Sequence, residues 1–85
     1  MKVWASLVKD SETYARASAE SLLEDASEAL MECLEKVYKE LDVSEPVWVK
    51  KHAQDLQRYH RAKFLPADFL EKVDFDSLII EFSPV

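Results

Sequence analysis

The residues best suited to proton transfer are His52 and Asp55, which lie three positions apart. On a helix this spacing places the two side chains on the same face. A carboxylate that orients an imidazole is the arrangement of a general base, although exposed helix surfaces carry such pairs as well. No recognisable motif places a nucleophile or an oxyanion donor near the pair. We therefore predict that the chain has no catalytic residues and is not an enzyme.

Metal binding is not indicated by the spacing of the histidines, the cysteine or the acidic residues. His52 and His60 are eight positions apart, which on a helix separates them by about 80° around the axis and about 12 Å along it. Asp74 and Asp76 offer oxygen ligands to a hard cation, but acids at this spacing also mark the turn before a strand. Cys33 is the single cysteine and falls on an apolar pattern, so we expect it in the core. We predict neither a metal nor a cofactor.

The composition excludes several kinds of ligand-binding loop, because the chain contains no glycine. The phosphate-binding loop of nucleotide enzymes, the dinucleotide-binding fingerprint, the nucleophile elbow and the EF-hand loop all require glycine. They need it where the backbone takes a positive φ or approaches a ligand closely. The sequence therefore indicates no small-molecule substrate.

A basic stretch interrupts an otherwise acidic chain. The net charge is −6, yet residues 46–65 carry five basic groups against a single acidic one. Aromatic and basic side chains mix there, as they do in surfaces that contact phosphate or an acidic partner. The alternative is that this stretch pairs with acidic segments of the same fold. The residues that we expect at a binding surface are Trp48, Lys50, Lys51, Arg58 and Arg61.

Alternating patterns at the start of the chain predict two strands, over residues 2–9 and 12–19. We interpret them as a hairpin, although the turn lacks the Asn-Gly or Asp-Gly pair that two-residue loops favour. The same residues also fit a period of 3.6, so a helix is the alternative here. In the second strand the alternation places Tyr14, Arg16 and Ser18 on one face, and Thr13, Ala15 and Ala17 on the other.

The clearest element is an amphipathic helix over residues 21–41. Ser21 and Glu24 have the spacing of a capping box, and acids early with lysines late suit the helix dipole. A second helix is expected from about residue 46 to 62, with Ser44 as its N-cap.

The end of the chain completes the expected fold. A short helical turn is predicted over residues 67–72 and a strand over residues 76–83, where apolar residues alternate again. The order β-β-α-α-β is typical of an α+β protein with two layers. We predict a single domain over residues 1–85, with about three antiparallel strands packed on the long helix and a second helix beside it. An all-α bundle is the alternative.

The expected sheet leaves one face without a helix, and Trp4, Val8 and Ile79 fall on that face. An open apolar patch of this kind is typically covered by another chain, so we expect a protein partner or a homodimer. No signal peptide is visible, and no apolar run approaches the ~20 residues that span a bilayer. We therefore expect a cytoplasmic protein that does not contact a membrane.

Together these features favour a non-enzymatic protein that binds another macromolecule, either as an interaction module or as an inhibitor or accessory protein. Two alternatives use the charges. A nucleic-acid-binding accessory protein would use the basic stripe of residues 48–63. An acidic mimic of nucleic acid would present the carboxylates of the first helix to a nucleic-acid-binding enzyme.

Residues 41–82 resemble the C-terminal half of short bacterial proteins of uncharacterised function. The resemblance covers about half of the chain and implies that this region belongs to a folded domain. It implies no activity. The residues that carry it are Leu41-Asp42, Pro46-Val47-Trp48, Lys50-Lys51, Phe64, Phe69 and Val73-Asp74-Phe75-Asp76.

Overall fold

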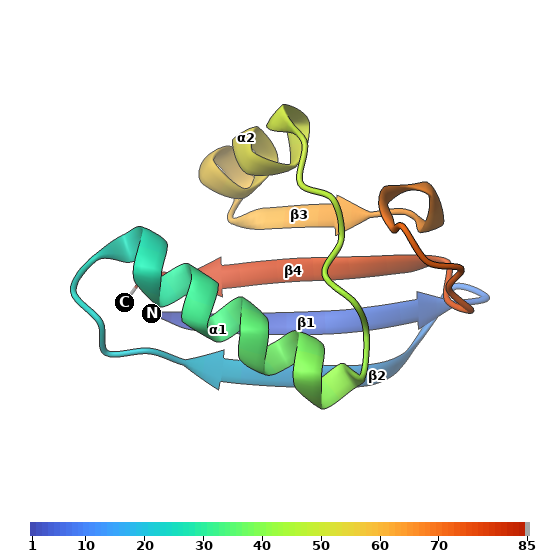
Figure 1. Ribbon diagram of the computed structural model, residues 1–85, viewed down its shortest axis with the longest axis horizontal. Helices are drawn as coiled ribbons and strands as arrows, with labels where there is room; N and C mark the ends of the chain where they lie inside the picture. Colours follow the sequence, from blue (N-terminus) through green and yellow to red (C-terminus); the bar gives the residue numbers. More distant parts are fainter. Residues whose placement is uncertain (85) are drawn as a thin grey trace.

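The computed structural model describes residues 1–84 (Figure 1). It contains one antiparallel sheet of four strands, together with two helices. This arrangement confirms the α+β class and excludes the all-α bundle, although the sheet has four strands rather than three. The strand order across the sheet is β2-β1-β4-β3. The elements are β1 (Lys2–Lys9), β2 (Glu12–Glu20), α1 (Ala26–Leu41), α2 (Lys50–Tyr59), β3 (Arg61–Phe64), the 3₁₀ turn η1 (Pro66–Asp68) and β4 (Ser77–Ser83).

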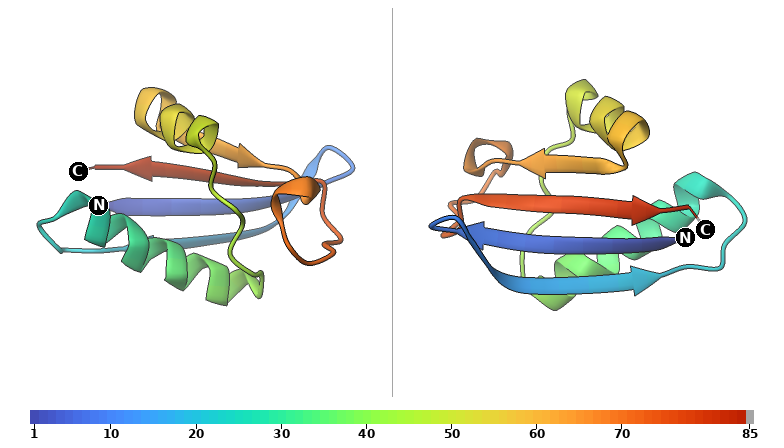
Figure 2. Two further views of the ribbon diagram at one scale, coloured as in Figure 1. Left: turned by 45° about the horizontal axis from the view of Figure 1, so that its top comes forward. Right: turned by 180° about the vertical axis from the view of Figure 1, so that it is seen from behind.

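Both helices lie on the same side of the sheet (Figure 2). α1 packs across β1 and β2, and α2 packs mainly on β3. Alternation along the strands turns one set of apolar side chains toward the helices, and small alanines in β2 leave room for α1. Each large side chain buried there contributes about 1.5–3 kcal/mol. The most deeply buried residues are Val3, Cys33, Val37, Phe64, Leu78 and Ile80.

The predicted hairpin of β1 and β2 is present, so the helical alternative for this region is wrong. Its two turn residues, Asp10 and Ser11, have positive φ angles of 53° and 66°. These are the angles of a type I′ turn, which joins strands with the correct twist. The backbone N–H of Asp10 donates to Asp76 Oδ2 at 2.8 Å, so a side chain from the segment before β4 holds the turn. Asp76 therefore has a structural partner at this position.

A β-bulge changes the face on which Tyr14 lies. Leu7 pairs with Ala15, whereas Val8 pairs with Thr13, so Tyr14 is the additional residue. It lines a pocket together with Leu7 and Ala15, on the side of the helices. The predicted alternation around Tyr14 and Thr13 is therefore wrong, because alternation is interrupted at a bulge.

Helix α1 begins five residues later than the sequence predicts. β2 continues to Glu20, and the helix starts at Ala26. The N-cap is Asp25, whose side chain accepts the backbone N–H of Glu28 at 2.9 Å. Ser21, the predicted cap, is buried at the end of β2 instead.

Helix α2 and strand β3 occupy a stretch for which the sequence predicts one helix. α2 starts at Lys50 and ends at Tyr59, and His60 then takes a left-handed conformation with φ of 58°. The next four residues, Arg61–Phe64, pair with β4 as an edge strand. The predicted helix from 46 to 62 is therefore wrong at both ends. The left-handed residue reverses the chain and allows the fourth strand.

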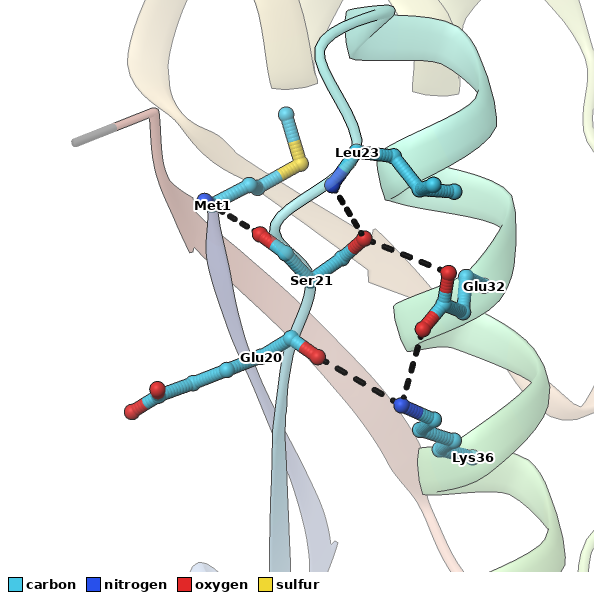
Figure 3. Close-up of polar contacts among 6 residues, drawn as sticks. All are labelled: Met1, Glu20, Ser21, Leu23, Glu32 and Lys36. Atoms are coloured by element: carbon cyan, nitrogen blue, oxygen red, sulfur yellow. Dashed lines mark hydrogen bonds and ion pairs between the residues drawn. The ribbon is translucent and has the colours of Figure 1, made fainter.

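A polar junction fixes α1 to the end of β2 (Figure 3). The Ser21 hydroxyl donates to Glu32 Oε2 at 3.3 Å, and Lys36 Nζ lies 2.9 Å from Glu32 Oε1. Lys36 also donates to the carbonyl of Glu20 at 3.5 Å. The hydrogen bond from Lys36 lowers the pKa of Glu32, and the same contact raises the pKa of Lys36. The orientation of α1 over the sheet is thus set by polar contacts in its middle turns as well as by its apolar face.

Candidate binding surface

Trp48 lies in the packing between α1, α2 and β3, where it is half-buried. Its Nε1 donates to Tyr38 Oη at 3.3 Å, and its ring meets Phe64 edge-on with centroids 4.7 Å apart. Burial raises the pKa of Tyr38 to about 12. Trp48 therefore offers the solvent only part of its ring, and its main contacts hold α2 against β3.

His52 is buried, and its carboxylate neighbour is Asp68. The imidazole Nδ1 accepts the backbone N–H of Val49 at 3.1 Å, and Nε2 lies 3.4 Å from Asp68 Oδ2. The ring stacks on Phe64 with centroids 4.2 Å apart. Asp55 does not orient this imidazole, because it forms an i,i+4 ion pair with a lysine of the same helix. His52 thus connects α2 with η1 and β3.

The expected basic stripe is divided among three places. Lys50 is exposed at the first position of α2, and Arg58 lies in a shallow depression beside two glutamines. The other basic residues come together where α2 meets the edge of β3. This hollow is lined by Lys51, Asp55, Tyr59, Arg61 and Lys63.

The side of the sheet opposite the helices is uncovered (Figure 2, right). The register confirms that Trp4, Val8 and Ile79 lie on this side, as the alternation predicts. Trp4 stands opposite Ser18 on one side and Glu81 on the other. We call this surface the open face and define it by Lys2, Trp4, Ser6, Val8, Arg16, Ser18, Glu20, Arg61, Lys63, Ile79 and Glu81.

Trp4 is the exposed aromatic residue near the middle of the open face, with 40% of its surface accessible. A shallow depression beside it is lined by Arg16 and Glu81, among others. Lys2 Nζ lies 5.4 Å from the centroid of the Trp4 ring, within the range of a cation–π contact. Lys2 therefore covers part of the indole, and the remaining exposed surface of Trp4 is open to a partner.

The open face carries more positive than negative charge. Its four basic and two acidic side chains give it a net charge of +2, whereas the whole chain has −6. Lys2 pairs with Glu20 at 3.6 Å. Within residues 1–84, Arg16, Arg61 and Lys63 form no ion pair. The acidic excess of the molecule therefore lies away from this face.

The sequence predicts Arg61 as a binding residue, but it does not predict that Arg61 lies on the open face of a sheet. Lys63 lies two positions further along β3 and belongs to the basic stripe of residues 48–63, whereas Arg16 and Lys2 come from β2 and β1, far from Arg61 in the sequence. A signal exists in residues 61–64, where exposed and buried positions alternate. Such alternation over four residues is too short to distinguish a strand from a helix end.

The described residues 1–84 hold no group of three or more His, Cys, Asp or Glu side chains arranged as metal ligands. Cys33 is fully buried, and burial raises the pKa of its thiol. No helix in this part of the chain is long and apolar enough to cross a membrane.

Comparison of the chain with protein-family models, with curated proteins and with solved structures gives no match. The functional inference therefore rests on the geometry and the charges of the open face.

Proposed function

We propose that this is a non-enzymatic protein that binds another macromolecule through its open face. The observation that carries the proposal is an exposed tryptophan, Trp4, near the middle of an uncovered sheet that also carries three basic side chains without an ion pair in residues 1–84. Burying one large aromatic side chain at the centre of a contact is how many interfaces gain most of their affinity. We also propose that the protein acts in the cytoplasm, as an inhibitor or accessory protein of the partner that it binds.

The shape of the open face supports a macromolecular partner over a small molecule. Four strands spaced about 4.8 Å apart make a face roughly 15 Å wide. Small-molecule sites are typically concave and enclose most of the ligand, whereas the hollows here are shallow. A broad and nearly flat surface of this kind fits an extended chain or the surface of another protein.

The charges favour an acidic partner over a second copy of the chain. A two-fold dimer through the open face would bring two surfaces of net positive charge together, which costs free energy unless each cation meets a carboxylate. The homodimer expected from the sequence is therefore the less supported partner. The alternative of an acidic protein that mimics nucleic acid gains no support, because Lys36 forms an ion pair with Glu32, one of the carboxylates on α1.

A photo-crosslinking experiment in the native cells tests this proposal without assuming a partner. Benzoylphenylalanine replaces Trp4, which is 40% exposed, in one variant and, as the control, Met31 on α1, which is 63% exposed. We expect crosslinked adducts from position 4 at several times the yield from position 31. Equal yields at the two positions, or no adduct from position 4, would contradict the proposal. The mass and nuclease sensitivity of the adduct identify the class of partner.

A further inference from the structure

We infer that the partner of the open face is single-stranded nucleic acid, with one base stacked on Trp4 and the flanking phosphates at Arg16, Arg61 and Lys63. This inference rests on the proposed function and specifies its partner. It combines three observations on one surface: a partly exposed indole, cations that form no ion pair within residues 1–84, and a net positive charge in an acidic molecule.

The position of Trp4 distinguishes single strands from duplexes. Bases in a duplex are stacked on each other, so their π-faces are not available to an aromatic side chain on a sheet. An unpaired base exposes its π-face and can lie on an aromatic side chain at the centre of a sheet. An exposed tryptophan in the middle of the surface adds nothing to a duplex contact and adds stacking to a single-strand contact.

The cations lie where the backbone of such a strand would run. In one row across the sheet, Arg16 of β2 and Lys63 of β3 are the two ends, separated by three strand spacings or about 14 Å. Arg61 lies in the neighbouring row, on the far side of Glu81 from Trp4. Guanidinium groups bind phosphate oxygens in a bidentate manner. A strand crossing the sheet therefore meets basic side chains on both sides of the stacked base.

The other charged groups on the face are compatible with this arrangement. Glu81 accepts hydrogen bonds only, so it faces a base N–H and not a phosphate. Lys2 lies over the Trp4 ring and must move aside for a base to stack there. Base stacking is stronger than an exposed cation–π contact, so this displacement does not prevent binding.

The hollow at the edge of β3 extends the same surface. Arg61 and Lys63 belong both to the open face and to this hollow, where Lys51 and Tyr59 follow. Tyr59 is exposed and offers a second aromatic ring. A strand that leaves Trp4 across β4 and β3 therefore reaches further cations and another stacking group.

Fluorescence anisotropy of a labelled 12-nucleotide mixed-sequence oligonucleotide tests the inference, using single-stranded RNA, single-stranded DNA and the matching duplex. We expect micromolar binding to a single strand and at least tenfold weaker binding to the duplex. Contacts with three or four phosphates predict that raising the salt from about 50 to about 200 mM weakens binding roughly 20- to 50-fold. Equal binding to the duplex would overturn the inference.

Three variants, one single and two double, distinguish binding at the open face from general electrostatic attraction. Trp4→Ala is expected to weaken binding at least tenfold, because it removes stacking and leaves the charge unchanged. Arg61→Glu with Lys63→Glu is expected to weaken it at least tenfold as well. Lys50→Glu with Arg58→Glu changes the net charge equally on exposed sides of α2 and should cost less than threefold. Equal losses for the two charge-reversal variants would overturn the inference.

Tryptophan fluorescence gives a readout that does not depend on the oligonucleotide label. In the Trp48→Phe variant Trp4 is the remaining tryptophan, and stacking of a base should quench its emission. Circular dichroism checks that each variant keeps its fold. If no oligonucleotide binds while a crosslinker at position 4 still captures a protein, the inference is wrong and the proposed function stands. If neither occurs, both are wrong.

Discussion

At the scale of single residues, the tryptophans show how position decides what a side chain does. Trp48 fits the basic stretch in the sequence, yet its hydrogen bond to Tyr38 and its contact with Phe64 place it in the packing. Trp4 belongs to a strand, and the absence of a helix on that side leaves it exposed. The proposed binding surface is therefore centred on a residue that lies outside the basic stretch.

The Trp48–Tyr38 contact has a measurable consequence for stability at high pH. Burial raises the pKa of Tyr38 from 10.0 to about 12. Between these values the unfolded chain loses the phenolic proton while the folded protein retains it, so the free energy of unfolding falls as the pH rises. A difference of two pKa units corresponds to a loss of about 3 kcal/mol.

Urea unfolding at about pH 9 and about pH 11.5 should detect about 2 kcal/mol of this loss, because the folded protein begins to titrate only near pH 12. Tyr38→Phe should remove most of the Tyr38 contribution to the pH dependence, whereas Tyr14→Phe, at an exposed tyrosine, should retain it. The assignment to Tyr38 is wrong if both variants lose stability over this interval to the same extent as the unaltered protein.

At the scale of elements, the chain forms its turns and helix ends without glycine. Among residues 1–84, four have a positive φ, and they are Asp10, Ser11, Asp42 and His60. Two of them form the hairpin turn, and two end the helices α1 and α2. A side chain in this conformation costs roughly 1–2 kcal/mol, because Cβ crowds the following carbonyl. The fold therefore contains positions at which glycine would stabilise it.

Replacement of Ser11 with glycine tests this conclusion. Ser11→Gly should raise the free energy of unfolding by about 1 kcal/mol, because it relieves the strain of the left-handed conformation. The same change in the middle of β2, Ser18→Gly, should lower it by about 0.5–1 kcal/mol. Thermal unfolding of the two variants measures both effects. A Ser11→Gly variant that is as destabilised as Ser18→Gly would show that the turn carries no strain.

The elements with a strong pattern could be predicted, and those set by tertiary contacts could not. Alternation identified β1, β2 and β4, and the apolar stripe identified α1. The cap spacing of Ser21 and Glu24 was misleading, because β2 continues to Glu20 and Ser21 is held by Glu32. β3 has only four residues and is defined by its pairing with β4. No local pattern reports such a pairing.

The binding surface was less predictable for the same reason. Arg61 was expected at a surface, but its neighbours Lys63 and Arg16 depend on the presence of β3 and on the strand order. The strand order places β1 and β4, the first and last strands in the sequence, side by side in the centre of the sheet. Cations from three separate segments thus share one face, which composition alone does not reveal.

At the scale of the whole molecule, the two sides of the sheet have different roles. The helix-covered side contains the apolar core, whereas the open face is flat, positively charged and centred on an aromatic ring. An acidic molecule with one positive face approaches a polyanion in a preferred orientation, because the remaining surface repels it. This asymmetry is the physical basis for proposing a single binding surface.

The most direct measurement is a titration of isotopically labelled protein with a single-stranded oligonucleotide, followed by two-dimensional NMR. We expect the largest shift changes at the Trp4 indole and at the backbone amides of Arg16, Ile79 and Lys63. The amides of α1 should change little. Shift changes centred on α1, or spread evenly over the molecule, would contradict the assignment of the open face as the binding surface.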